Sequence, residues 1–200
     1  PITLGFIIPV SVLLNFIIQG LAIANLENLI MAAMNRITLS FFVSLIVIAL
    51  ATAMVSTTTY KEQPFLNWLS TASSLGYAFP GAILAIGVVS FAGGVDSVTE
   101  RIQEYFHLKA YGGFLIGGTG LLILACVIRF QAVGYGSIVA GVSRLSPNIF
   151  AASASLGYSF SRSVFKLSPP LLSKSMLAGG ILVFVDAMKE LPMILLLRPF

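Results

Sequence analysis

Charged side chains are scarce in this chain of 200 residues, because Asp, Glu, Lys and Arg together make up only 9% of it. Soluble domains usually contain about 25% charged residues. Hydrophobic residues make up 58% of the chain, and its mean hydropathy is +1.00. This composition excludes an ordinary soluble protein and predicts a membrane protein.

Residues that carry enzyme chemistry are also scarce. The single cysteine, Cys126, lies in an apolar run and cannot form an internal disulfide, so we expect a buried, inert thiol. The single histidine, His107, is expected to be a solvated loop residue. The sequence has no Ser-His-acid set, no Cys/His metal cluster and no G-x-x-x-x-G-K-S/T phosphate-binding motif. We therefore expect no enzyme activity, no metal site and no cofactor in this chain.

The basic residues do not form a cluster. Eleven Lys and Arg residues give a net charge of +4, but they are scattered, whereas a nucleic-acid-binding protein carries a basic patch or stripe. The first residue is Pro1, and no basic-then-apolar signal peptide follows it. We expect no nucleic-acid partner, and we expect the chain to be part of a longer protein.

Long uncharged stretches are what the sequence has in abundance, and a helix needs about 20 apolar residues to cross a membrane. Five stretches predict an all-α polytopic membrane protein. Residues 1–26, 37–60 and 76–95 are uncharged, whereas 110–140 is expected to cross despite Arg129 and 175–197 despite three charged residues. The uncharged run 63–95 is too long for one helix, and Gly76, Pro80 and Gly81 predict a surface segment before the third span. Gly113 and Gly117 give the fourth span a small-residue face suited to close helix packing.

The bases in the loops predict the orientation, since short cytoplasmic loops are rich in Lys and Arg. The loop 144–174 has four bases and no acid, and Lys61 adds a base to another loop, so both are expected in the cytoplasm. The loops 25–36 and 96–109 hold four acids against three bases and are expected outside. The chain then starts in the cytoplasm and leaves its fifth span outside.

The fifth expected span carries charges, with Asp186 near its middle and Lys189 and Glu190 nearer its outer end. On insertion scales, three central charges oppose membrane insertion by about 8 to 10 kcal/mol. The span's eleven Leu, Ile, Val and Phe residues favour insertion by only about 3 to 7 kcal/mol. Pro192 also interrupts the helix hydrogen bonds. The charges must therefore face protein or water, and Arg129, at a similar depth in the fourth span, is the expected partner of Asp186 or Glu190. This charge network either holds helices together or lines a translocation path.

The basic loop is also amphipathic. Its pattern is interrupted by Gly157 and closed by Pro169 and Pro170. The apolar residues at helical spacing are Leu145, Ile149, Ala152, Leu156 and Phe160. Such a segment either lies among lipid headgroups or docks on a partner protein.

The stretch AASASLG at 151–157, followed by nine residues and then LSPP, resembles the loop motif of permease subunits of binding-protein-dependent ABC importers. That motif reads Glu-Ala-Ala, three residues, Gly, nine residues and Ile-x-Leu-Pro. Ala152, Gly157, Leu167 and Pro170 therefore stand at motif positions.

The chain departs from this motif at three positions, where Ala151 replaces Glu, Ser153 replaces the second Ala and Pro169 replaces Leu. Two other stretches, SLGYAFPGAILAIG at 74–87 and VFVDAMKELPMILLLRPF at 183–200, resemble the second half of duplicated ferric-iron importer permeases.

The resemblance implies a type I ABC importer permease fold: one permease domain over residues 1–200, about five spans, and at least one more span after Phe200. It implies a coupling loop, residues 144–170, that docks on a cytoplasmic ATPase dimer. The residues expected to couple are Ala152, Leu156, Gly157, Phe160, Leu167 and Pro170. Gly157 would let the loop change direction between two short helical pieces.

The same resemblance implies the partners. ATP and Mg²⁺ would be bound by the ATPase, and ferric ion would arrive chelated on a periplasmic or extracellular binding protein. The ion would pass between this chain and a second permease half, in the inner (plasma) membrane of a bacterial-type cell.

Two other classes of protein fit parts of the sequence. A secondary transporter also carries intramembrane charges and broken helices, but it does not need a long acid-free amphipathic loop. A structural membrane protein would explain the spans and leave Asp186, Lys189 and Glu190 without a role.

Overall fold

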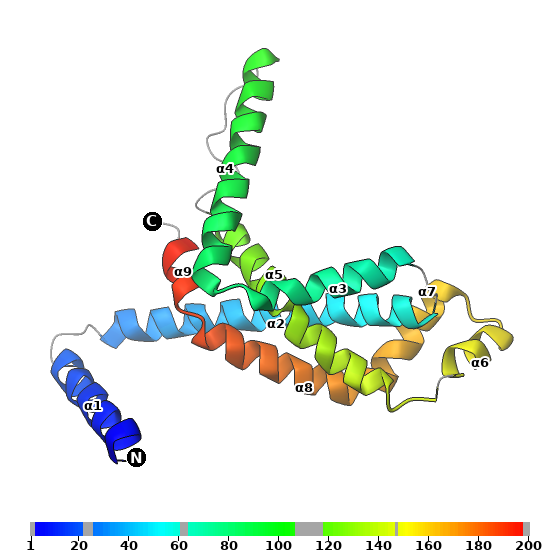
Figure 1. Ribbon diagram of the computed structural model, residues 1–200, viewed down its shortest axis with the longest axis horizontal. Helices are drawn as coiled ribbons and strands as arrows, with labels where there is room; N and C mark the ends of the chain where they lie inside the picture. The colour runs from blue at the N-terminus through cyan, green and yellow to red at the C-terminus, as the bar shows by residue number, and fades with distance from the viewer. Residues whose placement is uncertain (1–2, 22–25, 61–63, 107–117, 147, 198–200) are drawn as a thin grey trace. The chain divides into compact units, whose positions relative to one another are not determined.

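A computed structural model describes residues 3–21, 26–60, 64–106, 118–146 and 148–197 (Figure 1). Three residues with expected roles, His107, Gly113 and Gly117, lie outside the described residues. The chain divides into two compact units, residues 1–38 and 39–200, and each is described by itself.

The first unit contains a π-helical turn, η1 (Thr3–Ile7), then α1 (Ile8–Leu21) and the beginning of α2. The side chains from Leu4 to Gly20 are all exposed. The apolar helical stretch Leu4–Gly20 is shorter than the roughly 20 residues that cross a hydrocarbon core. A span at 1–26 therefore stays a prediction.

The helix α2 (Leu26–Tyr60) is 35 residues long and starts well before the expected position 37. The expectation of an outer loop at 25–36 is therefore wrong. The segment LENLIMAAMNR consists largely of strong helix formers and has no glycine or proline. Its charges shorten the uncharged stretch without ending the helix.

A break separates α3 (Pro64–Ala78) from α4 (Gly81–Tyr105), which confirms that the run 63–95 is not one helix. Pro80 lies at the break with φ −54° and ψ 137°, an extended conformation. Proline fixes φ and disfavours a helical conformation at the residue before it, here Phe79. The helix α4 continues to Tyr105, so most of the outer loop expected at 96–109 is also helical.

The helix α5 (Thr119–Val142) is central to the second unit and packs against α3 and α4. Glycines permit several close approaches, and three of them show the pattern. A Cβ atom added at Gly76 would lie 2.1 Å from the Ile128 carbonyl oxygen, and one at Gly134 would lie 2.5 Å from Val47. Small residues let helices approach closely in membranes.

The third close approach joins α5 to α8 (Ser168–Lys189), where a Cβ at Gly141 would lie 2.3 Å from the Ser175 hydroxyl. The helix α2 also reaches α8, because Ser44 Oγ donates a hydrogen bond to the Gly180 carbonyl at 2.7 Å. Glu190 follows α8 in an extended conformation, with φ −74° and ψ 99°, and α9 (Pro192–Leu197) begins after it.

This break corrects the expected fifth span, 175–197: it is not one continuous helix, because α8 ends at Lys189 and Glu190 lies beyond it. Pro192 cannot donate a helix hydrogen bond, and it forces the chain to leave the helical path just before it.

Four helices are long and apolar enough to cross a membrane: Leu26–Thr59, Gly81–Tyr105, Thr119–Val142 and Ser163–Lys189. All elements of the described residues are helical. The protein is therefore an all-α membrane protein. The buried core of the second unit combines side chains from α2, α4, α5, α8 and α9, among them Val43, Ala92, Phe130, Val183 and Met193.

Candidate functional site

The loop 144–170 contains three short helical pieces: α6 (Ile149–Ser155), α7 (Phe160–Arg162) and the π-helical turn η2 (Ser163–Leu167). They lie at one end of the second unit, and α8 runs from them toward α9 at the other end (Figure 1). Because η2 continues directly into α8, the loop is joined to a candidate membrane-crossing helix without a linker.

The bend expected at Gly157 is present, because this residue has φ +79°. Its N–H donates to the Ala154 carbonyl at 3.0 Å, and the Tyr158 N–H donates to the Ser153 carbonyl at 3.1 Å. These two bonds form a Schellman motif, in which a left-handed residue satisfies the last carbonyls of a helix. Side chains with a Cβ rarely adopt such a positive φ, so glycine suits this position.

Buried hydroxyl groups hold the pieces on either side of the bend together. The hydroxyls of Ser153 and Ser163 share a hydrogen bond of 3.0 Å, which joins α6 to η2. Ser168 Oγ donates to the Ser163 carbonyl at 3.3 Å, which ties η2 to the start of α8. The Arg162 guanidinium carbon lies 5.6 Å from the centre of the Tyr158 ring. The loop is therefore a folded projection with internal contacts.

The apolar positions of the loop do not form one helical face. The helix α6 begins at Ile149 and ends at Ser155, so it is too short to contain the whole pattern from Leu145 to Phe160. Leu145 and Ile149 are half-buried, whereas Ala152 is exposed and the side chain of Leu156 is 79% exposed.

The other expected coupling residues lie beyond the bend. Leu167 is half-buried at the end of η2, and Pro170 is exposed in the first turn of α8. Phe160 begins α7, and its side chain lies outside the described atoms.

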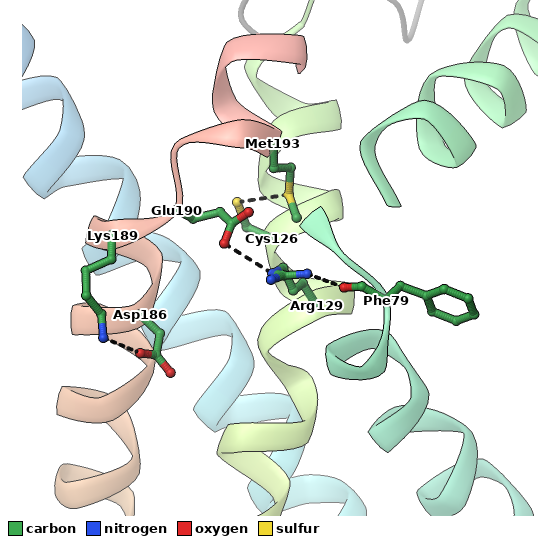
Figure 2. Close-up of polar contacts among 7 residues, drawn as sticks. All are labelled: Phe79, Cys126, Arg129, Asp186, Lys189, Glu190 and Met193. Atoms are coloured by element: carbon green, nitrogen blue, oxygen red, sulfur yellow. Dashed lines mark hydrogen bonds and ion pairs between the residues drawn. The ribbon is translucent and has the colours of Figure 1, made fainter. Parts of the chain in front are cut away.

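A second candidate site is the charge pair Arg129–Glu190, which Figure 2 shows between α5 and the break after α8. Arg129 Nε lies 3.2 Å from Glu190 Oε2, and the two side chains are only 16% and 11% exposed. The contact is an ion pair rather than an aligned hydrogen bond at Nε. The guanidinium also lies within 6 Å of the Tyr77 and Phe130 ring centres, at 5.8 and 5.9 Å. The expected pairing of Arg129 with Glu190 is thus present.

Each charge of this pair also lies at a helix end of the opposite partial charge. Arg129 Nη1 donates a hydrogen bond to the carbonyl of Phe79, the residue that follows α3. Glu190 Oε1 lies against Gly81, the first residue of α4, where an added Cβ would be 2.0 Å away. Cations are favoured at the C-terminus of a helix and anions at the N-terminus. The ion pair therefore bridges the break between α3 and α4.

Asp186 does not join Arg129, although the sequence led us to expect one network. Its carboxylate instead pairs with Lys189 at 3.0 Å, one turn along α8 (Figure 2). The Lys189 side chain is 68% exposed and that of Asp186 is 25% exposed. The two residues are three positions apart on a helix, a spacing at which opposite charges meet.

Sulfur atoms hold α9 beside the ion pair. The Cys126 thiol donates to the Met193 thioether sulfur at 3.8 Å, and both side chains are buried. Cys126 is one turn before Arg129 on α5, so this contact lies beside the charge pair (Figure 2). The expectation of a buried thiol is confirmed.

Sequence reasoning did not predict the contacts of three members of this junction, Phe79, Gly81 and Met193. Pro80 and Gly81 indicated a break in the helix, but no local sequence pattern indicated which side chains would contact the helix ends at this break. Among the residues that the structure describes, His, Cys, Asp and Glu form no group of three or more that could hold a metal ion. No protein-family model matches the chain, and no curated protein matches it significantly.

Proposed function

We propose that this chain is the membrane-spanning permease subunit of a binding-protein-dependent ABC importer, with ferric iron as its cargo. In this proposal it has the type I permease fold and forms half of the translocation path in a bacterial-type inner membrane. Its partners are a second permease half, a cytoplasmic ATPase dimer that binds ATP and Mg²⁺, and an external substrate-binding protein.

The observation that carries the proposal is the loop bend at Gly157. The resemblance to the importer motif requires a glycine between two short helical pieces, and Gly157 has φ +79° in a Schellman motif between α6 and α7. The hydrogen bond from Ser153 to Ser163 then fixes the two pieces to one another. A force applied to α6 would reach η2 through the hydrogen bond between Ser153 and Ser163, and η2 continues directly into α8.

The same helix could carry motion to the charge junction. The helix α8 packs along α5, and its far end leads into Glu190, which pairs with Arg129 of α5. In the proposed importer, movement of the loop by the ATPase would shift α8 against α5 and strain this ion pair. The ferric-iron assignment has a narrower basis. It rests only on the resemblance of the stretches 74–87 and 183–200 to the second half of duplicated ferric-iron importer permeases.

The test uses two variants of the full-length protein, Gly157→Val and Gly157→Ala. Both should insert in the membrane, because an added Cβ at Gly157 meets no described atom within 4 Å. Both should lose coupled uptake because of the positive φ, with valine worse than alanine because it is β-branched. Gly136→Ala is the matched control, since a Cβ there also meets no described atom within 4 Å.

The measurements are retention of the ATPase during purification and ATP turnover in reconstituted vesicles with the loaded external protein. Loss of retention or of stimulated turnover in the Gly157 variants alone would support the proposal. Normal coupled transport by Gly157→Val would overturn it.

A secondary transporter is the second candidate, and one observation favours it. Two interrupted helices, α3/α4 and α8/α9, meet at a buried ion pair. Interrupted helices near the middle of the membrane are common in such transporters. Uptake into vesicles that hold an ion gradient but no ATP would support this class, whereas uptake that requires ATP would exclude it.

A further inference from the structure

One side of α2 carries a row of buried side chains at every fourth position, and most of them bear hydroxyls. This hydroxyl row consists of Ser40, Ser44, Ile48, Thr52 and Ser56. The exposed fractions of these residues lie between 0% and 8%. Residues four apart lie on the same side of a helix, and the row covers about 24 Å along the helix axis. A hydrocarbon core is about 30 Å thick, so the row extends across most of a membrane.

Three hydroxyls of the row are buried without a partner among the described atoms. They belong to Ser40, Thr52 and Ser56. Nearby on α2, Thr57 and Thr59 donate to carbonyls of their own helix at 2.6 and 2.8 Å. A hydroxyl on this helix can therefore be satisfied by its own backbone, but these three are not. Burying an unpaired hydroxyl costs stability, above all in a membrane, so these groups require a polar partner of another kind.

Water fits the spacing of the hydroxyl row. Hydroxyls four residues apart are separated by about 6 Å along the helix axis. One water molecule spans this gap, because each O–H···O hydrogen bond is about 2.8 Å long. Thr52 and Ser56 form one such pair, and Ser40 and Ser44 form another. The Ser44 oxygen can still accept hydrogen bonds while it donates to the Gly180 carbonyl. Neither pair contains a charged group, so the row suits water rather than an ion.

Ile48 interrupts the row at its centre. It leaves about 12 Å along the axis between Ser44 and Thr52, a gap that one water cannot span. Glycines of α5 and α8 lie around this side chain. A Cβ added at Gly179 would lie 3.0 Å from Ile48 Cδ1, and one at Gly134 would lie 3.6 Å from the same atom. Apolar constrictions stop water by dewetting, so Ile48 is placed to seal the row.

One cavity lies beside this seal and another lies at an end of the row. A groove of about 480 Å³ between α2 and α8 is lined by Ile48 and by apolar side chains such as Leu45 and Leu177. It has room for the Ile48 side chain outside the contact with the glycines. A second cavity of about 460 Å³ is lined by α2 residues next to Ser56 and by part of α5. Its hydroxyl-bearing residues are Thr58, Thr59, Tyr135 and Ser143.

We propose that the hydroxyl row is a water path through a single chain, and that Ile48 is the seal that closes it. In the described conformation Ile48 lies against the glycines and separates the two hydroxyl pairs. When Ile48 turns into the groove beside it, water connects Ser44 with Thr52 and the path becomes continuous. This inference goes beyond the importer proposal and does not depend on it, because every contact that carries it lies within this chain.

The test compares Ile48→Thr with Ile48→Val in the full-length protein. Both new side chains are β-branched and similar in shape, but only threonine adds a hydroxyl to the row. Val47→Thr is the positional control, since Val47 is fully buried in the same helical turn but is not part of the row. The proteins are reconstituted in vesicles with an imposed pH gradient. An entrapped pH-sensitive dye follows the decay of the gradient, because a continuous file of water conducts protons.

We expect Ile48→Thr to dissipate the gradient about tenfold faster than the unmodified protein, which corresponds to a barrier lower by about 1.4 kcal/mol. Ile48→Val and Val47→Thr should leak no faster than the unmodified protein. Slow maleimide labelling of the buried Cys126 shows that each variant is folded. An equal leak from Ile48→Thr and either control, or no added leak from folded Ile48→Thr, would overturn the proposal.

A second measurement leaves Ile48 in place and so decides the matter even if Ile48→Thr does not fold. In a Cys126→Ser background, Thr52→Cys and Ser56→Cys should react with a small hydrophilic methanethiosulfonate, because water from the cavity near Ser56 reaches both. Val47→Cys should not react. All three positions are almost fully buried, so packing alone predicts equal reactivity. Equal reactivity at the three positions would show that water does not follow the row, and the proposal would be wrong.

Discussion

The ion pair between Arg129 and Glu190 should stabilise the second unit far more than the pair between Lys189 and Asp186. Glu190→Gln keeps the shape of the side chain but leaves the Arg129 charge buried, with side-chain exposure of only 16%. Removing one partner of a buried pair costs about 3 to 5 kcal/mol. Asp186→Asn should cost at most about 1 kcal/mol, because Lys189 is 68% exposed and the pair is partly solvated.

The single cysteine provides the assay. Cys126 is fully buried against Met193, one turn from Arg129, so a thiol-reactive fluorogenic maleimide can label it only when this region opens. A loss of 3 kcal/mol raises the open population by a factor of roughly 10². In detergent, Glu190→Gln should therefore be labelled about a hundredfold faster than the unmodified protein, and Asp186→Asn less than about tenfold faster. Cys126→Ser gives the background.

A second variant tests whether the effect comes from the pair itself. Adding Arg129→Gln to Glu190→Gln removes the uncompensated charge, so the double variant should lose less stability than the sum of the single losses. Equal labelling of Glu190→Gln and Asp186→Asn, or strict additivity of the Arg129 and Glu190 changes, would refute the reasoning.

Two further predictions concern the helix break and the orientation. Gly81→Ala should destabilise the protein, because the new Cβ would lie 2.0 Å from Glu190 Oε1 and would push this carboxylate away from its ion pair with Arg129. Gly87→Ala should not, because its Cβ meets no described atom within 4 Å. The same labelling assay measures both variants, and equal effects would contradict the packing at Gly81. In a Cys126→Ser background, an impermeant thiol reagent applied to intact cells should label Ser97→Cys and spare Ser161→Cys. Ser161 lies in the basic loop, and short basic loops stay in the cytoplasm. Labelling of Ser161→Cys from outside would reverse the orientation.

The long helices could be predicted from the sequence, but their ends could not. Counting uncharged residues located the middle of α2 and α4, because charge is costly in lipid, and α5 was expected to cross despite Arg129. The same count placed the start of α2 near 37 instead of Leu26, since Glu27 and Arg36 end the uncharged stretch while remaining helical. Prolines were the better markers of helix ends: Pro80 and Pro192 both lie at breaks.

The charge site was predictable only in part, for a similar reason. Arg129 and Glu190 lie at similar depths in their expected spans, and this was enough to propose their contact. Such a contact requires only that the two spans pass close to each other. Asp186 instead pairs with Lys189, three residues along the same helix, a local contact that the search for a partner at similar depth in another span did not consider. The contacts to Phe79 and Gly81 depend on tertiary packing of α3, α4 and α5, which no local pattern encodes.

One of the three charges in the last expected span, Glu190, can now be explained together with Arg129 by the helix breaks beside them. A break inside a membrane exposes carbonyl and N–H groups that lipid cannot satisfy, so something in the protein must meet them. Arg129 meets the carbonyl end of α3 and Glu190 meets the N-terminus of α4, so each charge compensates a helix end as well as its partner. In this arrangement the pair holds helices together. If it also lines a path, the same charges must leave these helix ends in another conformation, and water or cargo must then replace both contacts.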